Sequence, residues 1–176
     1  KHPVSFQPIL GDIRDKALLH RVFSSFQPDV VFHAAAYKHV PMQEDHPWEA
    51  VLTNINGTLN LMDASEDYEV DRFVLVSTDK AVNPTNIMGA TKRVAEKLIQ
   101  SKAIDSKVNY MAVRFGNVIG SSGSVIPTFQ EQIRNGGPVT ITNPKMQRYF
   151  MSISEAAQLI LEAGSMGSGG EVYVLD

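Results

Sequence analysis

Four consecutive polar residues, Ser77, Thr78, Asp79 and Lys80, follow a short apolar run, and Lys92 lies in the amphipathic stretch that comes next. These side chains supply hydroxyls, a carboxyl group and two amines, which are groups that transfer protons in general acid–base catalysis. Open α/β sheets carry their chemistry at the carboxyl ends of strands and at the helix starts that follow. The sequence therefore predicts an enzyme whose catalytic residues include Thr78, Asp79, Lys80 and Lys92.

Composition argues against several other classes of function. The 176 residues carry a formal net charge of -3 and no cysteine, so we expect no nonspecific nucleic-acid binding, disulfides or thiolate catalysis. The five histidines show no metal-site spacing, and no run of about 20 apolar residues could span a membrane. We expect a soluble, cytoplasmic protein without bound metal or nucleic acid, or one on the cytoplasmic face of the membrane if an anchor lies upstream.

The hydrophobic pattern predicts the elements that must hold the polar residues. Short apolar runs rich in β-branched and aromatic residues alternate with longer amphipathic stretches. The short runs lack polar alternation, which is typical of strands covered on both faces by helices. The pattern predicts a Rossmann-like, doubly wound parallel α/β sheet. Strands are expected at 6–10, 30–33, 72–76 and 108–114, and helices at 16–26, 48–66, 88–102 and 125–135.

Local signals mark where several of these elements begin. Asp12 and Asp15 are expected to cap the first helix, Pro47 to start the second, and Asn86 to cap the helix that contains Lys92. After residue 136 the pattern changes, which indicates a smaller second region. That region is expected to contain short strands, a helix at 154–163 and a final strand at 171–175.

The chain contains no Gly-x-Gly-x-x-Gly turn. Dinucleotide-binding sheets normally open with a strand, such a turn and a helix whose start holds the pyrophosphate. Either the protein does not bind a dinucleotide, or the first strand–turn–helix unit is missing from this chain. We favour the second interpretation because the run at 6–10, followed by Gly11-Asp-Ile-Arg-Asp15, looks like an interior strand of such a sheet.

Five separated segments carry a resemblance to a known family. They are Gly11-Asp-Ile-Arg-Asp15, His33-Ala-Ala-Ala-Tyr-Lys-His-Val-Pro41, Thr53-Asn-Ile-Asn-Gly-Thr58, Ser77-Thr-Asp-Lys80 and Arg114-Phe-Gly-Asn-Val118. The chain resembles extended short-chain dehydrogenases/reductases, and within them the UDP-N-acetylglucosamine 4,6-dehydratases of bacterial capsule and O-antigen polysaccharide biosynthesis. The resemblance implies NAD or NADP as cofactor, a UDP-sugar as substrate and a homo-oligomer. It also implies an NAD(P)-binding domain at 1–136, without its amino-terminal unit, and part of a substrate-binding region at 137–176.

The resemblance assigns the proton transfers of the reaction to particular side chains. Hydride leaves C4 of the sugar, the resulting ketone acidifies the C5 proton, water is lost across C5 and C6, and hydride returns to C6. Asp79 is similar to the acid at C6 and Lys80 to the base at C5, a role that requires a lowered lysine pKa. Related enzymes usually carry a tyrosine four residues before the helix lysine, whereas this chain has Met88 and resembles a branch with methionine there. We expect the C4 hydroxyl proton to pass to Thr78, relayed by Lys92 or water.

The resemblance also implies contacts with the two ligands. The residues expected at the cofactor are Asp12, Ile13, Ala34, Ala35, Ala36, Asn54 and Lys92, with Asp12 and Ile13 at the adenine. Asn54, on a helix expected to carry a backbone distortion, either stabilises that kink or orders a water beside Lys92. The residues expected at the substrate are Lys38, Thr78, Asn117, Ser121, Ser124 and Arg148, with Arg148 on the diphosphate.

Two other functions stay open at this point. A 4-epimerase would share the fold but needs no acid–base pair for C6, so the Asp79-Lys80 sequence disfavours it. A non-catalytic nucleotide-sugar-binding domain is suggested by Met88 and by the absent glycine turn. Thr78-Asp79-Lys80 could also be a plain solvated turn, and Lys38 a plain loop lysine. We expect the chain alone to bind NAD(P) poorly and to be inactive.

Overall fold

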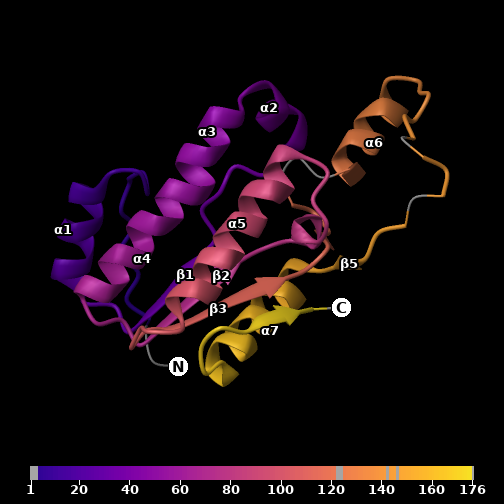
Figure 1. Cartoon of the computed structure of the whole chain (residues 1–176). Coiled ribbons are helices and arrows are strands. Elements are labelled where there is room, and N and C mark those ends of the chain that lie inside the picture. The colour runs from indigo at the N-terminus through magenta and orange to yellow at the C-terminus, as the bar shows by residue number, and fades with distance from the viewer. Residues whose placement is uncertain (1–3, 122–124, 142, 146, 176) are drawn as a thin grey trace.

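The computed structural model describes residues 4–121, 125–141, 143–145 and 147–175. At its centre is a four-stranded parallel sheet in the order β1-β2-β3-β6 (Figure 1). The strands are β1 (Val30–His33), β2 (Arg72–Val76), β3 (Asn109–Arg114) and β6 (Val172–Val174). The helices are α1 (Lys16–Phe26), α2 (Val40–Asp45), α3 (Pro47–Val51), α4 (Thr58–Asp67), α5 (Ile87–Lys102), α6 (Val125–Arg134) and α7 (Ile153–Met166).

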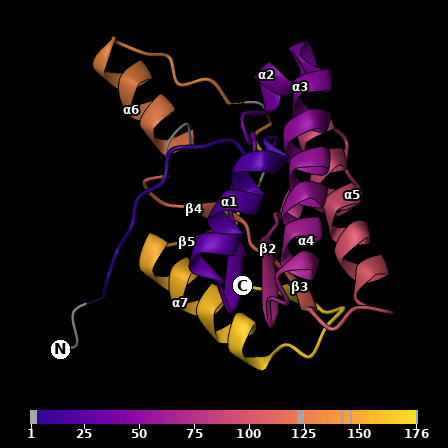
Figure 2. The same cartoon turned by 90° about the vertical axis from the view of Figure 1, so that its left-hand side faces the viewer.

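Helices cover the sheet from both sides, with α1, α4 and α5 on one face and α7 on the other (Figures 1 and 2). Successive side chains of a strand point to opposite faces. Phe73 and Leu75 of β2 accordingly join one buried cluster with Ile99 of α5, whereas Val74 joins a second cluster with Ala163 of α7. This two-sided core holds the strand ends on a rigid layer.

The predicted fold class is confirmed, and so are most of the predicted elements. β1 and β2 have the predicted bounds. The side chain of Asp15 accepts a hydrogen bond from the Leu18 N–H at 3.0 Å, and that of Asn86 accepts one from the Gly89 N–H at 2.8 Å, so both predicted caps are present. The predicted helix at 48–66 is a continuous helical run formed by α3, the π-helix η1 (Leu52–Gly57) and α4.

The predicted strand at 6–10 is wrong, and so is the predicted cap at Asp12. Residues 4–10 form no strand, and Phe6 and Leu10 are 84% and 100% exposed. The described sheet runs β1-β2-β3-β6, and none of these strands pairs with residues 6–10. The Asp12 carboxylate instead binds the backbone and guanidinium of Arg14.

Residues after 136 are divided between two sheets. β6 joins the main sheet beside β3, whereas β5 (Phe150–Met151) pairs with β4 (Asn117–Val118) in a separate two-stranded parallel sheet. α6 projects away from the main sheet (Figures 1 and 2). β6 thus extends the main sheet and α7 packs against it, while the domain boundary expected at residue 136 stays a prediction.

Candidate active site

The carboxyl end of β2 places Thr78, Asp79 and Lys80 together. The Asp79 N–H donates to the Phe115 carbonyl at 3.1 Å, so the backbone stays paired with the chain after β3. Asp79 then opens a single 3-10 turn, η2 (Asp79–Ala81), which the Thr78 hydroxyl caps by accepting from the Lys80 N–H at 3.4 Å. The predicted proton-transfer residues therefore lie on a backbone that the sheet holds in place.

Asp79 and Lys80 form an ion pair. Lys80 Nζ donates to Asp79 Oδ1 at 3.0 Å, and the Thr78 hydroxyl donates to the same oxygen at 2.9 Å. Burial raises the pKa of Asp79, but hydrogen bonding and charge from Lys80, together with the Thr78 hydroxyl, outweigh burial and leave that pKa below its ordinary value. Asp79 is therefore negatively charged at neutral pH.

Lys92 brings a second amine, on the second turn of α5. It is almost completely buried, at 6% exposure. Burial lowers the pKa of Lys92 to about 8, although the negative charge of Glu96 opposes this shift. The Lys92 ammonium forms no hydrogen bond or ion pair with any described residue. Met88, one turn earlier, is buried at 4% exposure, and its thioether cannot transfer a proton.

Gly89 lets the start of α5 approach η2 closely. A Cβ at this position would collide with the Lys80 carbonyl oxygen and would lie 3.2 Å from the Pro84 side chain. A glycine is therefore needed here for the contact between the two backbones. Because of this contact, the position of Lys80 depends on the helix that carries Lys92.

A fully buried carboxylate, Glu96, lies one turn beyond Lys92. It is 0% exposed and accepts hydrogen bonds from the Ser77 hydroxyl and from the guanidinium groups of Arg93 and Arg114. Burial raises the pKa of Glu96, but the hydrogen bonds from Arg114, Ser77 and Arg93 outweigh burial and lower that pKa. Sequence reasoning missed Glu96, and the available signal was its place four residues after Lys92, on the same helix face.

Asn54 lies in the π-helix η1, where the expected backbone distortion is present. Its Oδ1 accepts from the Tyr37 N–H at 2.8 Å, and its Nδ2 lies 3.0 Å from the Tyr37 carbonyl, 3.1 Å from Gln43 Oε1 and 3.0 Å from Thr91 Oγ1. The side chain thus joins the loop after β1 to the residue next to Lys92. This clamp on Tyr37 could not be predicted from the sequence.

His33, at the end of β1, is neutral and lies within the electrostatic reach of Lys92. The Thr58 hydroxyl donates to the Asn54 carbonyl at 2.7 Å, so His33 Nε2 must donate to Thr58 at 2.8 Å. Nδ1 is then a bare acceptor, buried without a partner among the described residues. Burial, and then the charge of Lys92, lower the pKa of His33 to about 3.

The remaining predicted site residues are less tightly held. Asn117 lies on β4 and has a buried Oδ1 without a partner in the described part of the chain. Arg148 is exposed and, among the described residues, donates to the neighbouring Gln147 carbonyl at 2.9 Å. Ser124 lies outside the described residues. The others lie at or near the surface, with Asp12, Ala34, Ala35 and Lys38 exposed and Ile13, Ala36 and Ser121 half-buried.

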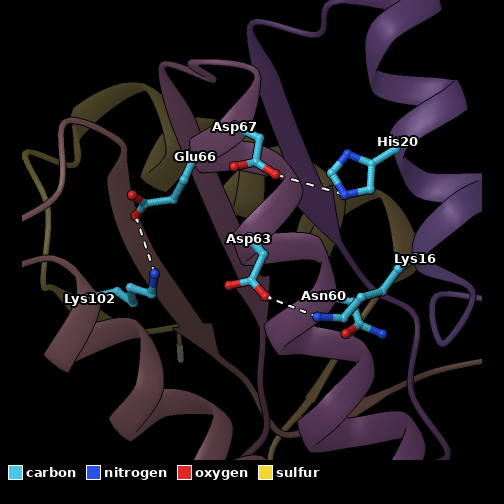
Figure 3. Close-up of a pocket in the computed structure, with 7 residues that line it drawn as sticks. All are labelled: Lys16, His20, Asn60, Asp63, Glu66, Asp67 and Lys102. Carbon is cyan, nitrogen blue, oxygen red and sulfur yellow. Dashed lines mark hydrogen bonds and ion pairs between the residues drawn. The ribbon is translucent and has the colours of Figure 1, made fainter.

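A surface hollow of about 410 Å³ lies away from the strand ends, between α1, α4 and α5 (Figure 3). Its lysines face carboxylates, Lys16 with Asp63 at 3.4 Å and Lys102 with Glu66 at 3.9 Å, and His20 lies 3.8 Å from Asp67. These long contacts between partly exposed groups are typical of a solvated surface. We therefore place the site at the strand ends, where the less exposed functional groups converge.

The described residues contain neither a metal-binding cluster nor a membrane-spanning helix. No cluster of His, Asp and Glu side chains there could hold a metal ion. No helix in the described part of the chain is long and apolar enough to cross a membrane.

Comparison with known proteins places this fold and site in a class. A solved structure of Pen from Bacillus thuringiensis is 42% identical and superposes with a TM-score of 0.88, covering 96% of this chain and 52% of that one. A dTDP-glucose 4,6-dehydratase from Streptomyces venezuelae, solved with NAD and TYD bound, shares the fold at 24% identity and a TM-score of 0.85, covering 93% of this chain and 56% of that one. The protein is thus an extended short-chain dehydrogenase/reductase with a Rossmann-like fold.

The sequence comparisons define the family within this class. The family model described as "Polysaccharide biosynthesis protein" matches residues 1–176, and the chain belongs to that family. It is 55% identical to the capsular polysaccharide biosynthesis protein CapD of Staphylococcus aureus, over 98% of this chain and 29% of that protein.

Relatives with a named reaction fall into two groups. A UDP-glucose 4-epimerase of Rickettsia canadensis is 41% identical over 94% of this chain and 49% of its own length. An inverting UDP-N-acetylglucosamine 4,6-dehydratase of Campylobacter jejuni is 38% identical over 94% of this chain and 50% of its own length. Both of these relatives are named for reactions on nucleotide sugars, and the chain spans half or less of their length.

Proposed function

We propose that this chain provides the proton-transfer centre of an NAD(P)-dependent 4,6-dehydratase that acts on UDP-N-acetylglucosamine in polysaccharide biosynthesis. The observation that carries the proposal is the Asp79–Lys80 pair, a carboxylate and an amine 3.0 Å apart at the carboxyl end of β2. Loss of water across C5 and C6 needs a base for the C5 proton and an acid for the C6 hydroxyl. The pair supplies one group of each kind.

The residues present fit part of a dinucleotide site. Small side chains, Ala34 to Ala36, follow β1, and Lys92 holds an ammonium without a partner among the described residues. Both features suit a ligand that brings oxygen atoms to the strand ends. The phosphate-binding glycine turn is not in this sequence. When bound, NAD(P) supplies the reversible acceptance of hydride from C4 and its return to C6.

The ion pair must rearrange before it can act on the sugar. The lowered pKa of Asp79 places the shared proton on Lys80 at neutral pH. Moving that proton across the hydrogen bond gives a neutral amine and a carboxylic acid, without exchange with solvent. The amine then takes the C5 proton while the acid protonates the departing C6 hydroxyl as water, and the pair returns to its charged form. As hydride returns to C6, the Lys80 ammonium gives a proton to C5. The proton taken earlier from the C4 hydroxyl then restores the charge on Lys80.

Thr78 is proposed to receive the C4 hydroxyl proton, relayed by Lys92 or water, because Met88 cannot take it. The Thr78 hydroxyl already donates to Asp79 Oδ1 at 2.9 Å. The negatively charged Asp79 carboxylate would therefore stabilise a proton that arrives at Thr78. For the substrate, we propose contacts with Lys38, Asn117, Ser121, Ser124 and Arg148. Asn117 is the best supported of these by the structure, since its buried Oδ1 has no partner among the described residues.

A second candidate is a 4-epimerase, which the 41% identity to the Rickettsia canadensis enzyme favours. Epimerisation inverts C4 and leaves C5 and C6 untouched, so it gives the Asp79–Lys80 pair no role. Both reactions begin with oxidation at C4, so Met88 does not distinguish them. The pair supports the dehydratase over the epimerase.

The experiment follows the full-length gene product with UDP-N-acetylglucosamine and NAD or NADP by mass spectrometry. A dehydratase forms a product lighter by one water, an epimerase forms an isomer of unchanged mass, and a binding domain leaves the sugar intact. Lys80→Met should reduce turnover by about 10²-fold or more. The control Lys97→Met, at an exposed lysine on α5, should retain full turnover. An isomer of unchanged mass as the only product would overturn the proposal.

A further inference from the structure

The buried carboxylate of Glu96 has no free position for another donor. Its Oε1 accepts from the Ser77 hydroxyl at 2.7 Å and from Arg114 Nε at 2.7 Å. Its Oε2 accepts from Arg114 Nη2 at 2.6 Å and from Arg93 Nη1 at 3.1 Å. An ionised carboxylate has about four lone-pair positions, and these four donors fill them. Because it is also 0% exposed, Glu96 cannot bind a ligand or exchange a proton with one.

Lys92 is the donor that this arrangement excludes. Lys92 and Glu96 are four residues apart on α5, a spacing at which lysine and glutamate commonly pair. Both residues are buried, so a salt bridge between them would offset the cost of removing the ammonium from water. The structure nevertheless has no such bond. Arg114 reaches the carboxylate from β3 and takes both oxygens in a bidentate fork, the strongest geometry for this pair.

We propose that Arg114 and Glu96 are positioning residues that keep the Lys92 ammonium unpaired, so that it is available to an oxygen atom of a bound ligand. Arg114 saturates Glu96, and Glu96 in turn supplies the negative charge that keeps Lys92 protonated in its buried position. The inference rests on the proposed function only for the identity of the ligand. It assigns no proton transfer to either positioning residue.

The other charged groups around Lys92 do not compete for its ammonium. On β1, His33 is neutral and carries no negative charge that could pair with Lys92, because burial and then the charge of Lys92 lower its pKa. On η2, which α5 touches at Gly89, the Asp79 carboxylate is paired with Lys80. On α5 itself, the guanidinium of Arg93 is paired with Glu96. Glu96 is therefore the acid whose pairing decides the state of Lys92.

The test is the titration of Lys92 in the full-length gene product. Lysine labelled with ¹³C at Cε is followed by NMR from pH 6 to pH 11, and Lys92→Met assigns the signal. In the wild type the midpoint should lie near 8. In Arg114→Met, Lys92 should pair with the vacated carboxylate, and its midpoint should rise by about one pH unit or more. Glu96→Gln removes the charge, so its midpoint should fall below that of the wild type.

Arg93→Met is the matched control, because it removes the other guanidinium from the same carboxylate. The Arg93 side chain is 38% exposed, compared with 15% for Arg114, and makes a single contact with Glu96. Its variant should shift the midpoint by less than about 0.5 pH units. If Arg114→Met does not fold, Arg114→Lys replaces it, since it keeps the charge but loses the fork, and its midpoint should rise by a smaller amount.

A folded Arg114 variant with an unchanged or lower Lys92 midpoint would overturn the inference. Activity provides a separate readout, with kcat/KM falling about 10-fold or more in Arg114→Met and staying unchanged in Lys97→Met, at an exposed lysine of α5. If the wild type leaves the sugar intact while the Lys92 midpoint shifts as expected in the variants, the proposed function alone is refuted. If the wild type is a dehydratase but the Lys92 midpoint does not shift in the variants, this inference alone is refuted.

Discussion

Replacing Lys92 by methionine should stabilise the protein while removing its activity. The Lys92 side chain is 6% exposed, its ammonium has no partner among the described residues, and burial lowers its pKa from 10.5 to about 8. A decrease of about 2.5 pKa units, at about 1.36 kcal/mol for each, corresponds to about 3 kcal/mol. At neutral pH the free energy of unfolding is lower by this amount, because folding must bury a charge. Methionine has a similar length and no charge, so it should recover most of the loss.

The effect has a definite pH dependence. Between pH 8 and pH 10.5 the unfolded chain holds the Lys92 proton more tightly than the folded protein does. The unfolded state therefore binds more protons in this window, and stability rises with pH. The penalty is fully present below pH 8 and is lost above pH 10.5. The stability difference between Lys92→Met and the wild type should accordingly be about 3 kcal/mol at pH 7 and should shrink as the pH rises towards 10.

The assay is urea unfolding at pH 7 and pH 9.5, with the free energy of unfolding taken from midpoints at a constant slope. Lys97→Met is the matched control, because Lys97 lies on the same helix, is exposed and donates to Gln100 on the surface of that helix. This variant should change stability by less than about 0.5 kcal/mol. If Lys92→Met is less stable than the wild type at pH 7, the ammonium makes stabilising contacts and the reasoning fails.

Three further variants test other parts of the structure. Asn54→Ala should lower the free energy of unfolding by about 2–4 kcal/mol in urea, because it breaks a buried clamp of hydrogen bonds; a loss under about 1 kcal/mol would contradict the clamp. Gly89→Ala should lower kcat about 10-fold by displacing the Lys80 backbone, and unchanged kinetics would show that η2 adapts. Asp15→Ala should lower the thermal midpoint, because loss of the helix cap costs about 1 kcal/mol. Asp12→Ala, at a residue that caps no helix, should leave the thermal midpoint nearly unchanged. Equal losses in these two variants would contradict the cap assignment.

The sequence predicted what depends on local pattern. β2 was predictable because its residues are apolar on both faces, as a strand between two helix layers requires. Asn86 was predictable as a cap because its side chain satisfies a nearby N–H of its own helix. The kink around Asn54 was expected from the family resemblance, and it is present as a π-helix.

Features that depend on distant partners could not be predicted in the same way. The run at 6–10 has the composition of a strand but has no neighbouring strand among the described residues. The bonds of Glu96 to Ser77 and Arg114 join residues 19 and 18 positions away, and no period of the sequence records them. Which member of the Asp79–Lys80 pair holds the shared proton also depends on geometry, because it follows from their 3.0 Å contact rather than from residue type.

The most direct test of the central claim is to run the reaction in deuterated water and locate the label by NMR. The full-length gene product should convert UDP-N-acetylglucosamine to a 4-keto-6-deoxy sugar with deuterium at C5, because a proton leaves that carbon and one returns from an exchangeable group. Lys80→Met should lose both the product and the label, while Lys97→Met should keep both. Product formation without deuterium at C5, or full labelling in Lys80→Met, would contradict the proposed role of the Asp79–Lys80 pair.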